Sequence, residues 1–120
     1  MILVIDDDPH IREYIKCIVE ALGYEVAEAG SGDDALKLYA EMPIKLVITD
    51  IVMPGTNGFQ CIGEIRKLSK DMPIIAMTSD IHGHADDYLL MCQKIGSNLV
   101  MYKPLTVEKV TASVKELYPL

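Results

Sequence analysis

A chain of 120 residues, half of them apolar, is long enough for one folded domain with a continuous core and too short for two. Its net charge of −7 and its lack of a Lys or Arg cluster argue against direct binding of nucleic acid by this domain. No apolar run approaches the roughly 20 residues of a membrane-spanning helix, and MILVI meets acidic residues too early for a signal peptide, so a cytoplasmic protein is expected.

The sequence predicts that the chain begins with a strand, a helix and a second strand. Residues 2–5 (ILVI) are all apolar, as expected for a strand that is buried on both faces of a sheet. Asp8 followed by Pro9 predicts a helix that ends at Gly23, because Asp caps helix N-termini and Pro is favoured at the first helical position. Residues 24–29 (YEVAEA) alternate in polarity, which is typical of a strand nearer the edge of a sheet.

The middle of the chain continues this alternation. Residues 32–42 predict a short helix with acidic residues at its start, where the helix dipole favours them. Residues 45–49 (KLVIT) predict a buried strand that ends at Asp50, a residue type that strands disfavour. A helix is expected over residues 58–68 and a fourth strand over residues 73–77. Because an unpaired buried carboxylate is costly, Asp50 needs a compensating partner.

The last part of the chain predicts a helix over residues 85–95, a strand over residues 98–102 and a helix over residues 106–118. The whole pattern alternates five strands with five helices, which is typical of an α/β fold. Right-handed crossovers place the helices on both faces of a parallel sheet. The sequence contains no linker, repeat or low-complexity segment, so a single domain is expected.

The three cysteines, Cys17, Cys61 and Cys92, are odd in number, widely spaced and set among apolar residues. This pattern favours reduced thiols in the core over a disulfide framework or a zinc site. A structural role is therefore expected for each of them.

Polar residues follow the predicted strands at the edge where ligands bind in such sheets, at the carboxyl ends of the strands. They are Asp6, Asp7, Asp50, Thr78, Ser79 and Lys103. Three carboxylates packed together repel unless a cation intervenes, and oxygen ligands without His or Cys point to Mg²⁺. A divalent ion beside a lysine forms a receptacle for a phosphoryl group, and an aspartate placed there is able to act as a covalent nucleophile.

Four segments carry a family resemblance: LVIDDDP (3–9), LVITDIVMPGTNG (46–58), AMTS (76–79) and YKPL (102–105). In this order they resemble the receiver domain of two-component response regulators, of the chemotaxis-regulator type, over residues 1–120. The resemblance implies a flavodoxin-like, doubly wound sheet of five parallel strands in the order 2-1-3-4-5 with five helices.

The resemblance also implies a metal-dependent phosphoacceptor. Asp50 would accept a phosphoryl group from a phosphohistidine on a sensor histidine kinase or a His-containing phosphotransfer protein. Asp7 and Asp50 would bind Mg²⁺ directly together with the main-chain carbonyl of Val52, and Asp6 would hold a metal-bound water.

Two further site residues and an output surface follow from the same resemblance. Lys103 would pair with the phosphoryl oxygens, and the Thr78 hydroxyl would move to bond them. Residues 85–118 would contact the output partner. The domain would not be an enzyme with turnover, since it would catalyse only its own phosphorylation and slow dephosphorylation.

The chain departs from the family pattern around its predicted switch. Val100, three residues before Lys103, stands where Tyr or Phe is common, so Tyr102 is the nearby ring able to report the state of Thr78. The segment between Thr78 and Lys103 is also somewhat longer than usual, which enlarges the loop at residues 79–84. Two interpretations stay open: Tyr102 takes over the aromatic role, or the loop carries the change. We favour the loop.

Other functions fit the residues less well. A phosphatase with Asp6 as nucleophile and Asp8 as acid leaves Asp50 unexplained, and the chain has no room for a substrate cap. A flavin carrier needs a Gly-rich, hydroxyl-rich phosphate loop after the first strand, where this chain has DDDPH. The remaining alternative is a phosphorylation-independent docking scaffold with the receiver fold.

Overall fold

The computed structural model describes residues 1–51, 58–79 and 85–120. The strands are β1 (Ile2–Ile5), β2 (Val26–Ala29), β3 (Leu46–Asp50), β4 (Ile74–Ser79) and β5 (Leu99–Lys103). The helices are α1 (Pro9–Ala21), α2 (Gly32–Glu41), α3 (Gly58–Leu68), α4 (Ala85–Ile95) and α5 (Val107–Leu117). Each predicted element is present at its expected place. Within the described ranges, none of these helices is long and apolar enough to cross a bilayer.

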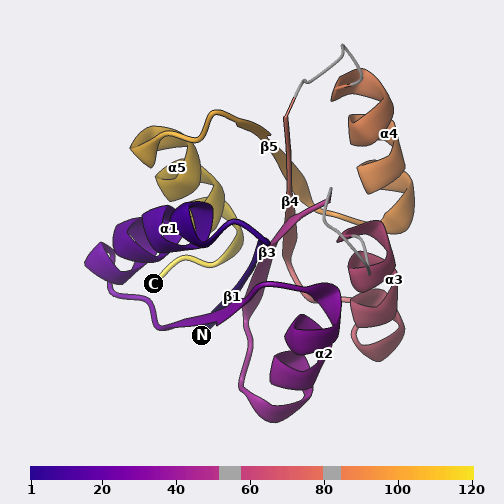
Figure 1. The fold of residues 1–120 in the computed structure, drawn as a ribbon, viewed down its shortest axis with the longest axis horizontal. Coiled ribbons are helices and arrows are strands. Elements are labelled where there is room, and N and C mark those ends of the chain that lie inside the picture. The colour runs from indigo at the N-terminus through magenta and orange to yellow at the C-terminus, as the bar shows by residue number, and fades with distance from the viewer. Residues whose placement is uncertain (52–57, 80–84) are drawn as a thin grey trace.

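The described strands form one parallel sheet in the order β2-β1-β3-β4-β5 (Figure 1). Strand β1 therefore lies between β2 and β3, although β3 follows it only after a second helix. Ile5 lies opposite Thr49, the neighbour of Asp50, so the ends of β1 and β3 emerge side by side. The sheet and its strand order confirm the expected doubly wound fold.

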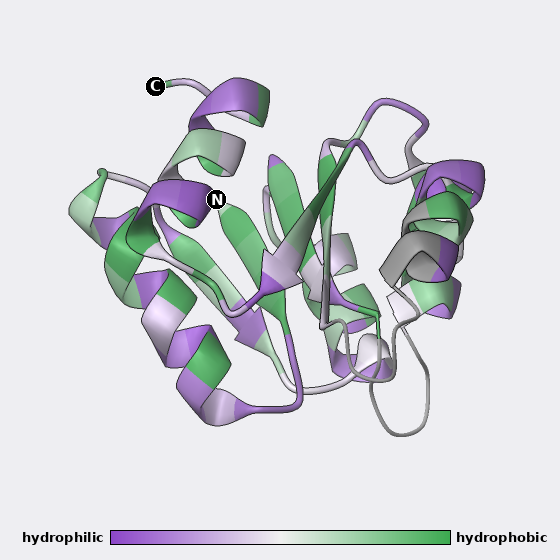
Figure 2. Ribbon diagram, turned by 90° about the horizontal axis from the view of Figure 1, so that it is seen from above, coloured by the Kyte–Doolittle hydropathy of each residue, from purple (hydrophilic) through white to green (hydrophobic). Residues whose placement is uncertain are grey.

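Two hydrophobic cores lie on the two faces of this sheet. Helices α1 and α5 cover one face, and α2, α3 and α4 cover the other (Figure 1). Side chains of β1 alternate between the cores: Ile2 and Val4 pack on the α1 and α5 side, and Leu3 and Ile5 on the opposite side. This double burial explains why the central strands are apolar throughout, while the helices show hydrophilic residues on their outer surfaces (Figure 2).

Strands β4 and β5 extend further than the apolar pattern predicts. The sequence places their ends at residues 77 and 102, but the structure continues them to Ser79 and Lys103. The last pairs in the parallel ladder are Thr78 with Tyr102 and Ser79 with Lys103. The apolar residues end before the strand pairing does. Polar side chains at this edge do not prevent the backbone hydrogen bonds of the sheet, so the strands continue past the apolar run.

The cysteine prediction is correct for Cys61 and Cys92, which are buried, and wrong for Cys17, which is exposed. On α1 the buried residues include Ile15 and Ile18. Cys17 follows Ile15 by two positions, which turns its side chain about 200° around the helix axis and away from the core. Its thiol instead donates a hydrogen bond to Oε1 of Glu13, at 3.4 Å.

We expect a thiol reagent to modify Cys17 alone in the native protein. Burial raises the pKa of Cys61 to about 11 and also raises the pKa of Cys92, so both lack access and thiolate character. The hydrogen bond to Glu13 raises the pKa of Cys17, which should make its reaction slower than that of a free thiol. Counting modified thiols before and after addition of denaturant checks this, and Cys17→Ser should lack the native reaction. Simultaneous modification of all three thiols in the native state would contradict it.

Candidate functional site

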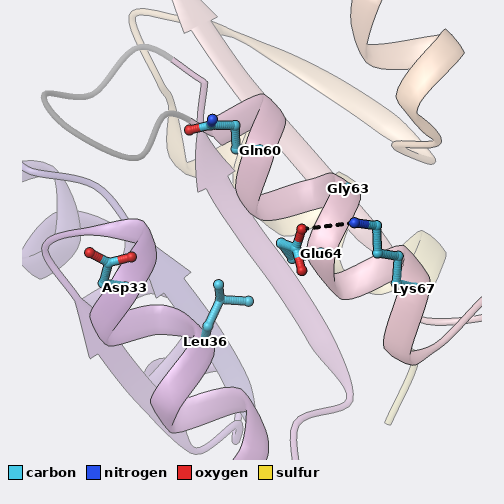
Figure 3. A pocket seen from close by; sticks show the side chains of 6 residues that line it. All are labelled: Asp33, Leu36, Gln60, Gly63, Glu64 and Lys67. Atoms are coloured by element: carbon cyan, nitrogen blue, oxygen red, sulfur yellow. Dashed lines mark hydrogen bonds and ion pairs between the residues drawn. The ribbon is translucent and has the colours of Figure 1, made fainter.

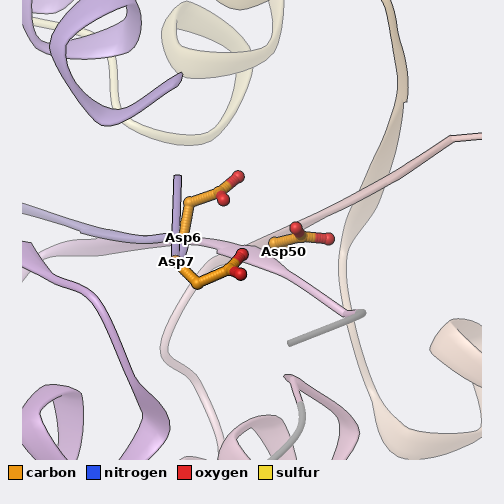
Figure 4. Close-up of side chains that lie close together, drawn as sticks. All are labelled: Asp6, Asp7 and Asp50. Atoms are coloured by element: carbon orange, nitrogen blue, oxygen red, sulfur yellow. The ribbon is translucent and has the colours of Figure 1, made fainter. Parts of the chain in front are cut away.

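Three carboxylates meet at the carboxyl edge of the sheet (Figure 4). Asp6 and Asp7 follow β1, and Asp50 is the last residue of β3. One carboxylate oxygen from each lies within 4.8 Å of the other two. Asp6 and Asp50 are buried and Asp7 is exposed, so the cluster is closed on the side of the core and open to solvent. The neighbouring positions of β1 and β3 bring these acids together.

Asp6 is held by hydrogen bonds on both carboxylate oxygens. Its Oδ1 accepts from the main-chain N–H of Asp8 at 2.9 Å, and its Oδ2 accepts from Nζ of Lys103 at 3.2 Å. Burial raises the pKa of Asp6 above its ordinary value, and the negative charge of Asp50 adds to the rise, against the opposing hydrogen bonds. These hydrogen bonds fix the orientation of the Asp6 carboxyl group, but burial still makes its ionisation costly.

Lys103 joins the two buried acids. Its Nζ lies 3.2 Å from Oδ2 of Asp6 and 3.1 Å from Oδ2 of Asp50. Since β4 separates β5 from β3, the lysine side chain extends across the end of β4 to reach both carboxylates. Burial disfavours the charged ammonium, but Asp50 and Asp6 together outweigh this and raise the pKa of Lys103. The lysine therefore stays protonated in the site.

Thr78 lies at the same edge, near the end of β4, between the strands that carry Asp50 and Lys103. It is fully buried, and its hydroxyl donates to the main-chain carbonyl of Ser79 at 3.4 Å. The structure thus brings together the strand-end residues that the sequence singled out. Val52, whose carbonyl was expected to bind the metal, lies outside the described residues.

The three acids fit the requirements of Mg²⁺. This ion prefers hard oxygen ligands in an octahedron. Ligands at about 2.1 Å place neighbouring oxygens about 3.0 Å apart and opposite oxygens about 4.2 Å apart. Oxygens that already lie within 4.8 Å of one another need only small side-chain rotations to reach such spacings. Asp6, Asp7 and Asp50 are therefore able to hold the ion, either directly or through its waters.

Sequence reasoning missed the close approach of Gly58 to the backbone of Asp50. An ideal Cβ at position 58 would lie 2.1 Å from the carbonyl oxygen of Asp50 and 2.5 Å from Cα of Ile51. Only glycine permits the first turn of α3 to pack directly on the chain that carries Asp50. In the sequence, the only signal was a glycine at the start of a predicted helix.

Sequence reasoning also missed Arg12, on the second turn of α1. Its Nη1 donates to the main-chain carbonyl of Asp6 at 2.7 Å, and its Nε donates to Oε1 of Glu28 on β2 at 3.3 Å. A basic residue one turn after an N-cap gives little signal by itself, because such residues are common on exposed helix faces.

The residues of the expected switch lie on β5. Val100 is half-buried and packs against the core beneath α2, α3 and α4. Val100 and Tyr102 both line a hollow of about 200 Å³, but so does Leu99, which packs in the core on the α1 and α5 side, so the hollow does not test whether Val100 and Tyr102 share a face. Of the loop at residues 79–84 that was favoured as the moving part, Ser79 ends β4 and residues 80–84 lie outside the described residues.

Two further hollows lie on the described surface. One, of about 390 Å³, lies between α2 and α3, and the ion pair of Lys67 with Glu64, at 3.1 Å along α3, forms part of its lining (Figure 3). The other, of about 290 Å³, is apolar and adjoins the acidic site. Its lining residues are His10, Ile11, Tyr14, Lys103, Pro104 and Leu105. Only the second shares a residue, Lys103, with the site.

Comparison with known proteins identifies the family. The family model described as "Response regulator receiver domain" matches residues 2–115. The chain is 32% identical to the sensor protein EvgS of Escherichia coli over 98% of its own length, but it spans only 10% of EvgS. The receiver domain of NtrX from Brucella abortus has the same fold, with a TM-score of 0.89 and 24% identity over 98% of this chain and 97% of that one. A receiver domain protein from Clostridium thermocellum is 34% identical, with a TM-score of 0.87 over 97% of this chain and 91% of that one. Fold, site and sequence agree that the chain belongs to the response regulator receiver domain family of two-component signalling systems.

Proposed function

We propose that this receiver domain accepts a phosphoryl group on Asp50 in a Mg²⁺-dependent reaction and thereby changes how it binds its partners. The observation that carries the proposal is the charge arrangement at the sheet edge. Three carboxylates lie within 4.8 Å of one another, and the two buried ones share the ammonium of Lys103. A docking scaffold that is never phosphorylated has no need to keep two repelling acids buried around one lysine.

Each residue has a separate part in the transfer. A carboxylate oxygen of Asp50 forms the new P–O bond while the P–N bond of a phosphohistidine breaks, and the donor imidazole keeps the electron pair. Asp6, Asp7 and Asp50 would hold Mg²⁺, which supplies positive charge against the phosphoryl oxygens. The Lys103 ammonium lies 3.1 Å from Asp50 and supplies the remaining positive charge. The Thr78 hydroxyl would leave the Ser79 carbonyl and donate to a phosphoryl oxygen.

The surface supports two classes of protein partner. The apolar hollow beside Lys103 offers a docking place for the phosphohistidine-bearing helix of a sensor kinase or phosphotransfer protein. On the output side, within residues 85–118, Leu90, Met91 and Val107 expose large apolar side chains on α4 and α5. We assign these residues to the surface that binds the downstream partner.

Acetyl phosphate with Mg²⁺ should add one phosphoryl group per chain, as intact-mass spectrometry would measure. Asp50→Asn should remain unmodified because it lacks the nucleophile, and a chelator should prevent the reaction of the parent. A generic phosphomonoester should be consumed in no more than a stoichiometric amount, unlike its continuous hydrolysis by a phosphatase. The same adduct on Asp50→Asn would defeat the assignment, and an unmodified parent that still binds a partner would favour the scaffold.

Mg²⁺ should stabilise the domain, since it relieves repulsion among the three acids. At ten times its dissociation constant, a ligand that binds only the folded state adds about 1.4 kcal/mol, which is a rise of a few degrees in Tm. Asp7→Ala should abolish the shift without lowering the metal-free Tm. Asp71→Ala, a change at an exposed acid on the α3 to β4 connection, should keep the full shift. Equal shifts in the two variants would contradict the assigned metal ligands.

A further inference from the structure

We infer that Arg12 is a positioning residue of the acidic site: it fixes the peptide unit between Asp6 and Asp7 and so sets the direction in which Asp7 presents its carboxylate. The inference rests on the proposed function, because it concerns the same divalent cation. It gives a side chain of α1 a part in shaping a site whose proposed ligands lie at or just after the ends of β1 and β3.

The hydrogen bond from Arg12 is made to the main-chain carbonyl between Asp6 and Asp7, so it affects the position of both residues. Nη1 of Arg12 donates to the carbonyl oxygen of Asp6 at 2.7 Å. This short hydrogen bond is charge-assisted and therefore stronger than a bond between neutral groups. The carbonyl belongs to the planar unit that joins Asp6 to Asp7, so holding its oxygen restricts rotation of the whole unit. The guanidinium thereby limits the directions open to the Asp7 side chain.

Asp7 depends on this restraint more than Asp6 does. Asp6 is held in addition through its own N–H, which donates to the Ala29 carbonyl at 3.1 Å, and through both carboxylate oxygens. Asp7 is exposed, so packing does not fix its side chain. The peptide unit held by Arg12 is the structural link between the rigid Asp6 and the exposed Asp7.

Strand β2 in turn holds the guanidinium. Nε of Arg12 donates to Oε1 of Glu28 at 3.3 Å, while Lys16 lies 3.5 Å from the other oxygen of the same carboxylate. Gly30 leaves the space, since a Cβ there would lie 3.2 Å from Nη1 of Arg12. Glu28 thus supports the guanidinium from the edge strand, and a glutamine there would keep the side-chain oxygen that accepts from Nε.

A simpler role for Arg12 is an ion pair that ties α1 to β2. The two roles make different predictions, because Glu28→Gln weakens the ion pair but leaves the bond to the Asp6 carbonyl in place. Arg12→Met removes both contacts and keeps much of the apolar stem. Arg12→Lys keeps a charged donor that is able to restore part of the contact with the carbonyl.

The test is the dissociation constant for Mg²⁺ alone, measured on the unphosphorylated full chain well below its Tm. Loss of a partner that orients a metal ligand typically weakens metal binding by about 10-fold to 100-fold, so we expect Arg12→Met to bind roughly 10-fold more weakly. Arg12→Lys should lie between it and the parent, and Glu28→Gln should stay close to the parent. Parental affinity in Arg12→Met, or an equal loss in Glu28→Gln, would overturn the inference.

A second readout needs no metal. The amide of Asp7 shares its peptide unit with the carbonyl that Arg12 holds, so its NMR resonance should move in metal-free Arg12→Met and stay in place in Glu28→Gln. If the parent binds no Mg²⁺, the proposed function fails, while the Asp7 resonance still decides whether Arg12 holds this peptide. An Asp7 resonance that does not move in Arg12→Met would overturn the positioning role.

Discussion

Replacement of Lys103 by methionine is expected to lower the free energy of unfolding by about 2 to 3 kcal/mol at neutral pH without divalent metal. The change leaves Asp6 and Asp50, whose side chains are 1% and 8% exposed, facing each other without a counter-charge. Removing one partner of a fully buried pair costs about 3 to 5 kcal/mol, and the 21% exposure of the lysine side chain reduces that figure. Urea denaturation of parent and variant measures the difference.

The difference in free energy of unfolding between the parent and Lys103→Met should become smaller as the pH falls from 7 toward 5. Burial already raises the pKa of Asp6 in the folded state, and loss of the lysine removes an opposing influence and raises it further. A carboxyl whose folded pKa lies above its unfolded value costs stability as the pH rises through that range, and this cost is relieved on acidification. Lys67→Met is the control, because Lys67 is 75% exposed and its loss should matter little at either pH. A deficit of the same size at both pH values would contradict the explanation.

Gly58→Ala is expected to destabilise the domain by about 2 to 3 kcal/mol, at the upper end of the range for overpacking. The new Cβ would lie 2.1 Å from the Asp50 carbonyl oxygen and 2.5 Å from Cα of Ile51, and these backbone atoms of a buried segment have little room to move. The displaced Asp50 backbone should also slow phosphoryl uptake. Denaturation and intact-mass measurements on the same protein check both effects.

Gly63→Ala is the matched control on the same helix. A Cβ at position 63 meets no atom within 4 Å beyond the neighbouring backbone of its own helix, so alanine should be neutral there or should stabilise the helix by up to about 1 kcal/mol. The two substitutions add the same methyl group to α3, but only the one at position 58 is expected to destabilise the domain. Equal effects would show that the close approach of Gly58 to Asp50 does not constrain this domain.

Much of the fold was predictable because its signals are local. Apolar runs and helical spacing predicted each element in order, and the N-cap at Asp8 is confirmed by its hydrogen bond to the N–H of His10 at 2.9 Å. The strand order came from the family resemblance, since periodicity alone does not choose among neighbours in a sheet. Asp6, Asp7, Asp50 and Lys103 were found because residues that leave parallel strands share one edge.

The features that were missed depend on segments far apart in the chain or on helical phase. Gly58 is needed because the start of α3 approaches the end of β3, and Arg12 acts through a main-chain atom of Asp6. Neither contact is visible in residue type or spacing. Cys17 was misjudged from its apolar neighbours, whereas its angle around α1 decided its exposure.

The central claim is that Asp50 is the residue that carries the phosphoryl group, and the most direct test is to locate that group. Borohydride reduces an acyl phosphate to an alcohol, so treatment of the phosphorylated protein should convert the modified aspartate to homoserine. Peptide mass spectrometry should then find homoserine at position 50, only after incubation with acetyl phosphate and Mg²⁺. Homoserine at Asp6 or Asp7 with an unchanged Asp50 would contradict the account and would support the phosphatase-like chemistry of the first acidic loop instead.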